Sequence, residues 1–174
     1  KVVRHPDNLG LGDSLNDGLV AASGEYIAIQ HADDISFPRR LEKQVAYLDS
    51  HPDIALVGTW TRYIDAEGVP KKKDGWWLRQ VKNLPDDPEV IEKKLLEMNC
   101  MIHSSVMYRK SVTGTVGFYD PDMVPTEDYD YWLRISEKHK LGIIREVLTS
   151  YRHHHNQLSR QEDKVRGYAE EALR

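Results

Sequence analysis

Two adjacent carboxylates, Asp33 and Asp34, are the residues of this sequence best placed to do chemistry. They follow a short apolar run at 26–29 that predicts a strand, and a helix is expected to begin at Pro38. Open α/β sheets bind ligands at the carboxyl ends of their strands, and paired carboxylates repel each other unless a cation or hydrogen-bond donors intervene. Hard divalent ions prefer oxygen ligands and share them with phosphates. The pair therefore predicts a metal–diphosphate anchor, with capping of the next helix by Asp34 or Ser36 as the alternative.

A second acidic group begins another predicted helix. Glu127, Asp128 and Asp130 fall in its first turn, where the positive end of the helix dipole favours carboxylates. Taken alone, this segment favours helix capping over any catalytic role.

Histidines are the remaining candidates for metal chemistry. His103 begins a predicted buried strand, so it is either a core residue or a contact to a metal or diphosphate. Residues 153–155 are three consecutive histidines, but side chains alternate along an extended segment and cannot all face one ion. One of them could close over a diphosphate together with Arg152; the alternative is a solvated tail.

Apolar periodicity predicts the elements that must hold these residues. Strands are expected at 26–29, 54–64, 103–109 and 143–151, and helices at 11–22, 39–50, 88–98, from 127 onward and 161–173. Residues 70–85 lack a clean period and predict a long connection, either a mobile lid or an ordered loop with packed tryptophans; residues 114–119 also resemble a loop. The alternation of strands and helices predicts an α/β domain with a mostly parallel sheet and flanking helices.

Composition narrows the class of protein. The 174 residues suffice for one domain, and the net charge of -4 argues against a general nucleic-acid binder. The single cysteine, Cys100, excludes an internal disulfide and fits a reducing compartment. No apolar run approaches the roughly 18 residues of a membrane span, and no signal peptide is apparent. We therefore expect a cytoplasmic location, with attachment to the inner face of a membrane left open.

Three segments in order resemble the family 2 glycosyltransferases, which have the Rossmann-like, nucleotide-sugar-binding GT-A fold. The segments are Asn8–Asp34 with its acid pair, Ile102–Arg109, and Glu127–Arg134 followed by Tyr151-Arg152-His153 and Ser159. Together they cover the chain to about residue 160. The resemblance implies one domain, 1–174, comprising most of a GT-A catalytic domain (about 1–160) and a C-terminal tail helix.

The sequence departs from the family pattern in three places. The first strand and its turn, which bind the nucleotide base and ribose, would precede Lys1, so the resemblance is to an N-terminally truncated domain. His31 stands where the longer acidic form of the strand-end motif has Asp, and Leu15 stands where many members have a basic residue. Because Asp33 and Asp34 are intact, metal and diphosphate binding is still expected.

The resemblance implies an inverting, metal-dependent transfer of a sugar from a nucleotide-diphosphate sugar to an acceptor hydroxyl, in polysaccharide or glycolipid biosynthesis. Mn²⁺ or Mg²⁺ is the implied cofactor, with Asp34 as its direct ligand and His103 or His155 as further candidates. Asp128 matches the general base. Nucleotide-sugar binding is implied for Asp33, Asp34, Asn16, Glu127 and Arg152, whereas Trp132 is expected in the core.

The implied partners are the donor and a saccharide or lipid-linked acceptor, with no nucleic acid. A sheet edge exposed by truncation could also pair with a second copy as a homodimer. Two other classes stay open: a non-catalytic fragment or sugar- or partner-binding module, and a phosphate-hydrolysing metalloenzyme that needs no acceptor.

Overall fold

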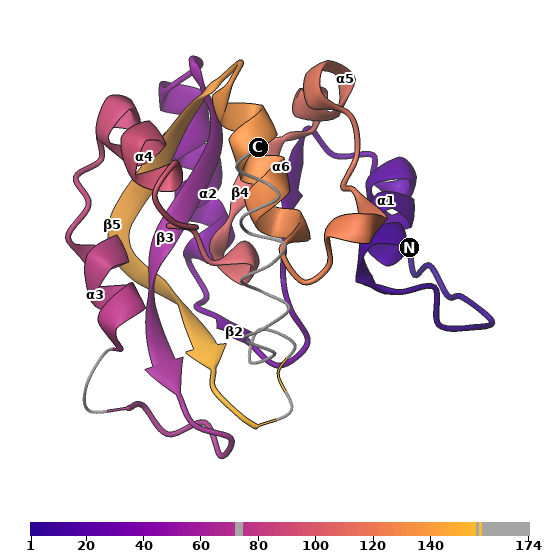
Figure 1. Cartoon of the computed structure of the whole chain (residues 1–174), viewed down its shortest axis with the longest axis horizontal. Coiled ribbons are helices and arrows are strands. Elements are labelled where there is room, and N and C mark those ends of the chain that lie inside the picture. The colour runs from indigo at the N-terminus through magenta and orange to yellow at the C-terminus, as the bar shows by residue number, and fades with distance from the viewer. Residues whose placement is uncertain (72–74, 156, 158–174) are drawn as a thin grey trace.

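A five-stranded sheet runs through the computed structural model, which describes residues 1–71, 75–155 and 157 (Figure 1). In spatial order the strands are β1 (Tyr26–Ala28), β4 (Met107–Arg109), β3 (Ile54–Ile64), β5 (Lys140–Arg152) and β2 (Ile35–Ser36). The long strands β3 and β5 are parallel, and the other three pairings are antiparallel. The predicted α/β class is confirmed. The sheet is mixed where the sequence predicted a mostly parallel one, because alternation of elements does not fix the direction of strands only two or three residues long.

Six α-helices flank the sheet in the described part of the chain: α1 (Leu11–Ala21), α2 (Arg40–Ser50), α3 (Trp76–Lys82), α4 (Pro88–Leu95), α5 (Thr113–Val116) and α6 (Glu127–Ser136). Three 3₁₀ turns, η1 (His103–Ser105), η2 (Lys110–Val112) and η3 (Pro121–Met123), complete the elements. The helices predicted near 11–22, 39–50, 88–98 and from 127 are confirmed. The predicted tail helix at 161–173 lies outside the described residues. No described helix is both long and apolar enough to cross a membrane.

Three predicted segments differ from the structure, and in one of them the predicted loop at 114–119 overlaps α5 (Thr113–Val116). The predicted connection at 70–85 contains α3, whose Leu78 and Val81 are buried three residues apart. This helix of seven residues begins after Gly75, which provides no side-chain cap. The sequence therefore contained little indication of where the helix begins. The predicted strand at 103–109 is limited to β4, because η1 occupies its first three residues.

Aromatic residues of α6 form the centre of the core. Tyr131 and Trp132 are fully buried, and Tyr131 stacks on Tyr119 with ring centroids 4.2 Å apart. Tyr108 of β4 packs edge-on against both α6 rings. The prediction that Trp132 belongs to the core is confirmed. This packing fixes the first turn of α6, which carries Glu127 and Asp128, against the sheet.

Arg40 of α2 joins the strand ends on which the candidate site is built. Its guanidinium is buried and donates from Nη2 to the carbonyls of Ile29 (2.8 Å) and Val106 (2.9 Å). Its Nε donates to Gln44 Oε1 (2.9 Å), and Gln44 Nε2 in turn donates to the carbonyl of Ser105 (3.0 Å). One face of α2 therefore positions the segments that follow β1 and precede β4.

Helix α1 packs closely on η3, and this contact predicts the effect of two alanine substitutions. A Cβ added at Gly12 would lie 2.6 Å from the main-chain Cα of Pro121, whereas one added at Gly18 meets nothing within 4 Å. Overpacking against main chain costs about 1–3 kcal/mol, and Ala is favoured over Gly in a helix interior by roughly 1 kcal/mol. Gly12→Ala should therefore lower the free energy of unfolding in urea, and Gly18→Ala should raise it. Equal effects of the two substitutions would contradict this packing.

Candidate active site

Asp34 lies in the loop between β1 and β2 and is held by two donors from distant parts of the chain. Its Oδ1 accepts from the main-chain N–H of Arg152 (2.8 Å), and its Oδ2 accepts from the hydroxyl of Ser104. Its side chain is fully buried, and this burial raises the pKa of Asp34 while the two hydrogen bonds act in the opposite direction. Within the described residues α2 begins after Arg39 without a side-chain cap, so the structure does not support the capping role for Asp34.

Asp33 is more exposed and faces the segment that follows β5. Its Oδ2 lies 3.1 Å from Nε2 of His154, and its main-chain carbonyl accepts from Arg152 Nε (2.7 Å). The Arg152 guanidinium also donates to the carbonyls of Asp65 and Ala66. Of the three consecutive histidines, His154 therefore lies at the acid pair, while His155, the candidate ligand from the sequence, is exposed.

His31, Asp33 and Asp34 form a donor set suited to a divalent cation. One ligand atom from each residue can be chosen so that all lie within 4.8 Å of one another. Two carboxylate oxygens and one imidazole nitrogen are ligands that Mn²⁺ and related first-row ions accept. The anchor predicted at Asp33 and Asp34 thus gains a third potential ligand from the same loop.

His103 lies between this donor set and the acids of α6. Its Nδ1 is 3.2 Å from His31 Nε2 and 3.8 Å from Glu127 Oε1, and its Nε2 is 3.3 Å from the hydroxyl of Tyr119. Burial holds the pKa of His103 well below its ordinary value, so the ring is neutral. His103 therefore contacts His31, which lies beside the acid pair, on one side and Glu127 on the other.

Glu127 and Asp128 present two carboxyl groups with different environments. Asp128 is partly exposed; its Oδ2 accepts from Asn99 Nδ2 (3.1 Å) and its Oδ1 from the N–H of Tyr129 (2.7 Å). Glu127 is buried, and its Oε2 has no hydrogen-bond partner among the described residues. Burial is the main cause that raises the pKa of both groups, and the neighbouring Asp128 raises that of Glu127 further. Carboxyl groups with raised pKa values are suited to proton transfer.

Some positioning residues were not visible in the sequence. Asn99 orients Asp128 and Ser104 holds Asp34, across 29 and 70 residues respectively. Asn16, a predicted nucleotide-sugar contact, donates to and accepts from the main chain of Tyr119 at 2.9 Å each. Ser104 belongs to the segment that resembles the family, which is a signal for its importance. Asn99 has no such local signal.

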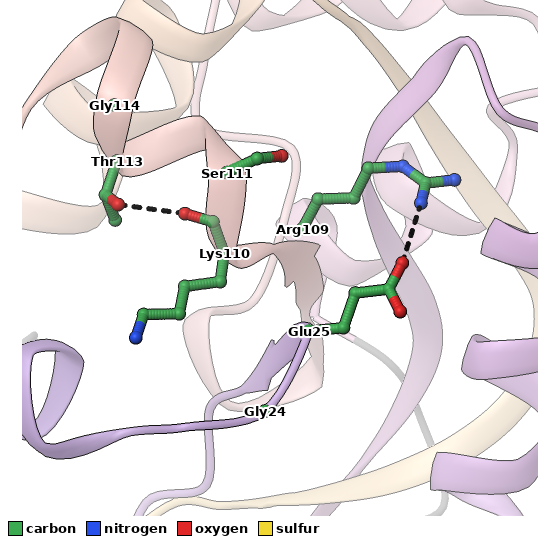
Figure 2. A pocket seen from close by; sticks show the side chains of 7 residues that line it. All are labelled: Gly24, Glu25, Arg109, Lys110, Ser111, Thr113 and Gly114. Atoms are coloured by element: carbon green, nitrogen blue, oxygen red, sulfur yellow. Dashed lines mark hydrogen bonds and ion pairs between the residues drawn. The ribbon is translucent and has the colours of Figure 1, made fainter.

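A separate hollow of about 510 Å³ lies at the β1–β4 edge (Figure 2). Its lining includes an ion pair between Arg109 Nη1 and Glu25 Oε1 at 3.9 Å, and the side chain of Lys110. The residues that line it include none of the acids described above, so this hollow is separate from the candidate site.

Comparison with known proteins identifies the class. Residues 1–117, about two thirds of the chain, match the family model for glycosyl transferase family 2, and the chain belongs to this family. It is similar to an uncharacterized glycosyltransferase, MJ1057, of Methanocaldococcus jannaschii, with 34% identity over 86% of this chain and 49% of the relative. It is also similar to the amylovoran biosynthesis glycosyltransferase AmsE of Erwinia amylovora (34% identity; 83% and 51% covered) and the O-antigen biosynthesis glycosyltransferase WbnJ of Escherichia coli (32%; 83% and 54%). The chain spans about half the length of these relatives.

The fold has a solved counterpart. The structure of TarS of S. aureus in complex with UDP-GlcNAc matches 87% of this chain and 41% of TarS, with a TM-score of 0.59 and 15% sequence identity. At that identity the likeness concerns the fold alone, and it confirms the GT-A architecture expected from the sequence.

Proposed function

We propose that this chain carries the catalytic centre of an inverting, metal-dependent glycosyltransferase, which uses a nucleotide-diphosphate sugar and an acceptor hydroxyl. The carrying observation is the contact series from His31 through His103 to Glu127, at 3.2 and 3.8 Å. The series joins the loop that carries Asp33 and Asp34 to the first turn of α6, which carries Glu127 and Asp128. This connection supports a single site that combines the donor-binding anchor with the candidate base.

On the donor side, the loop acids and the segment after β5 form the binding groups. A divalent cation held by Asp33 and Asp34 would neutralise charge on the leaving diphosphate. Arg152 holds the loop through the carbonyl of Asp33, and its main-chain N–H orients Asp34. His154 lies beside Asp33, where it can contact a bound phosphate. TarS is a fold relative that binds UDP-GlcNAc, which supports a nucleotide sugar as the donor here.

On the acceptor side, Asp128 is the proposed general base. Its carboxylate removes the proton of the acceptor hydroxyl as that oxygen bonds to the anomeric carbon, and the bond to the diphosphate breaks with its electron pair on the leaving group. Attack from the face opposite the diphosphate inverts the anomeric centre. Asn99 orients Asp128, and Glu127 beside it has a buried Oε2 without a hydrogen-bond partner among the described residues. The polysaccharide-synthesis names of AmsE and WbnJ support a saccharide or lipid-linked acceptor.

The donor-side proposal predicts a thermal shift. A panel of nucleoside diphosphates with Mn²⁺ should include one that raises the melting temperature of the parent, because a ligand at about 100 times its Kd stabilises the native state by about 2.7 kcal/mol. The shift should vanish in Asp34→Ala and persist in Asp13→Ala, a control at an exposed acid of α1. Absence of a shift with every nucleotide, or an equal shift in Asp34→Ala, would contradict the proposal. Nucleotide-sugar hydrolysis that is indifferent to acceptor would instead indicate a hydrolase.

A further inference from the structure

We infer that His31 is a nitrogen ligand of the cation at this site, and that it directs the site toward transition ions such as Mn²⁺ and Co²⁺ in preference to Mg²⁺. The inference deepens the proposed function, since it concerns the metal of the same site. It depends on His31, Asp34 and the chain of side chains behind them.

The spacing of His31 and Asp34 fits a shared ion better than a direct bond. Nδ1 of His31 lies 3.9 Å from Oδ2 of Asp34, which is too long for a hydrogen bond. Metal–nitrogen and metal–oxygen distances of about 2.0–2.2 Å place two ligands on opposite sides of one ion about 4 Å apart. Asp33 supplies a third ligand atom within the same group.

The residues behind His31 determine which of its nitrogens is free. Its Nε2 faces His103 Nδ1 at 3.2 Å, His103 Nε2 faces the Tyr119 hydroxyl at 3.3 Å, and that hydroxyl faces Tyr108 at 3.4 Å. If His31 donates from Nε2, His103 donates to Tyr119 and Tyr119 donates to Tyr108, and Nδ1 of His31 keeps its lone pair toward Asp34. The reverse direction would place a proton on Nδ1 with Asp34 beyond bonding reach. The network is therefore compatible with the tautomer that can bind a metal.

The imidazole of His31 affects which ion the site prefers. Carboxylate and water ligands suit Mg²⁺, whereas first-row transition ions also accept an imidazole, so a nitrogen ligand increases their affinity relative to that of Mg²⁺. A second residue that orients a ligating imidazole typically contributes 10–100-fold to metal affinity, and His103 is that residue here. His31 thus acts as the ligand that sets ion preference, and His103 is a positioning residue.

The test measures metal binding rather than activity. Mn²⁺ alone is titrated into the whole chain, and electron spin-echo spectroscopy detects nitrogen bound to the ion. The parent should show a nitrogen coupling that is lost in His31→Gln, with Mn²⁺ affinity reduced about tenfold or more, since loss of a residue that only orients a ligand already costs about 10–100-fold. His31→Asp should restore binding and lower the ratio of Mn²⁺ to Mg²⁺ affinity. His155→Gln, at an exposed neighbouring histidine, should match the parent.

Three outcomes would overturn the inference: no nitrogen coupling in the parent, a coupling that survives His31→Gln but is lost in His154→Gln, or an unchanged ion preference in His31→Asp. The first of these with Asp34-dependent Mn²⁺ binding intact would leave the proposed function standing, because an all-oxygen site still anchors a diphosphate. The proposed function fails separately, if nucleoside diphosphates do not bind or no sugar is transferred.

Discussion

Asp128→Asn should reduce sugar transfer by about 10²–10⁴-fold, the contribution typical of a general base, while nucleotide binding stays intact. The amide preserves the size of the side chain, and its one oxygen can still accept from Asn99 or from the N–H of Tyr129, but it cannot accept the acceptor proton. Transfer is measured with the full-length protein as nucleoside diphosphate released in the presence of acceptor. Nucleotide binding is followed by thermal shift.

Asp130→Asn is the matched control for this substitution. Asp130 belongs to the same helical turn, but its carboxylate pairs with Arg134, so the change should leave transfer near the parental rate. Equal losses in the two variants would indicate that the acids of α6 stabilise the helix and do not act on substrate. Loss of nucleotide binding in Asp128→Asn would place this residue on the donor side instead.

The environment of Asp128 also fixes the direction of the pH dependence. A general base acts when ionised, and burial raises the pKa of Asp128, so kcat/KM should rise with pH through a limb above the ordinary Asp value of about 4. Below that limb Asp128 is protonated and transfer is slow. A rate that is level down to pH 4 would contradict the assignment.

Arg40→Met is expected to lower the free energy of unfolding by about 2–5 kcal/mol. The substitution removes the donors to Ile29, Val106 and Gln44, and buried acceptors left without a partner cost about 1–3 kcal/mol each. Burial lowers the pKa of Arg40 only to about 10, so the group is still charged at neutral pH. Asp34 attracts this guanidinium electrostatically, so its removal also destabilises the charged form of that buried carboxylate.

Arg39→Met provides the control for Arg40→Met. Arg39 precedes Arg40 in the chain, is exposed, and pairs with Glu42 on the surface, where ion pairs contribute little. Urea unfolding should separate the two variants clearly. Similar midpoints and slopes would mean that α2 does not depend on the buried network, and the proposed role of Arg40 in holding the site would be wrong.

Elements with strong periodicity were predictable from sequence. The strand at 54–64 has the predicted bounds, and α1 and α2 lie within a residue or so of theirs. All three depend on local apolar spacing, which a single segment of sequence carries. The acid pair after the first strand was proposed as a site from its place at a strand end, and the resemblance extended the proposal to Asp128.

The parts that could not be predicted depend on contacts between distant segments. The hydrogen bond from Arg152 to Asp34 spans 118 residues, and nothing in either segment specifies the other. Asn16 was assigned to the donor by resemblance, yet both ends of its amide meet the main chain of Tyr119. Its role toward a nucleotide sugar stays a prediction. The direction of the short strands is also set by such contacts, which is why the mixed sheet was not foreseen.

The contact between His31 and His103 has a practical consequence for chimeras made with relatives. The two rings come from separate segments, the loop after β1 and the turn η1, and they meet edge to face with centroids 5.0 Å apart. A transplanted loop that brings a shorter side chain at position 31 would lose this junction unless position 103 were exchanged with it. Recombination that moves both positions as one block should therefore yield more active hybrids than exchange of either segment alone.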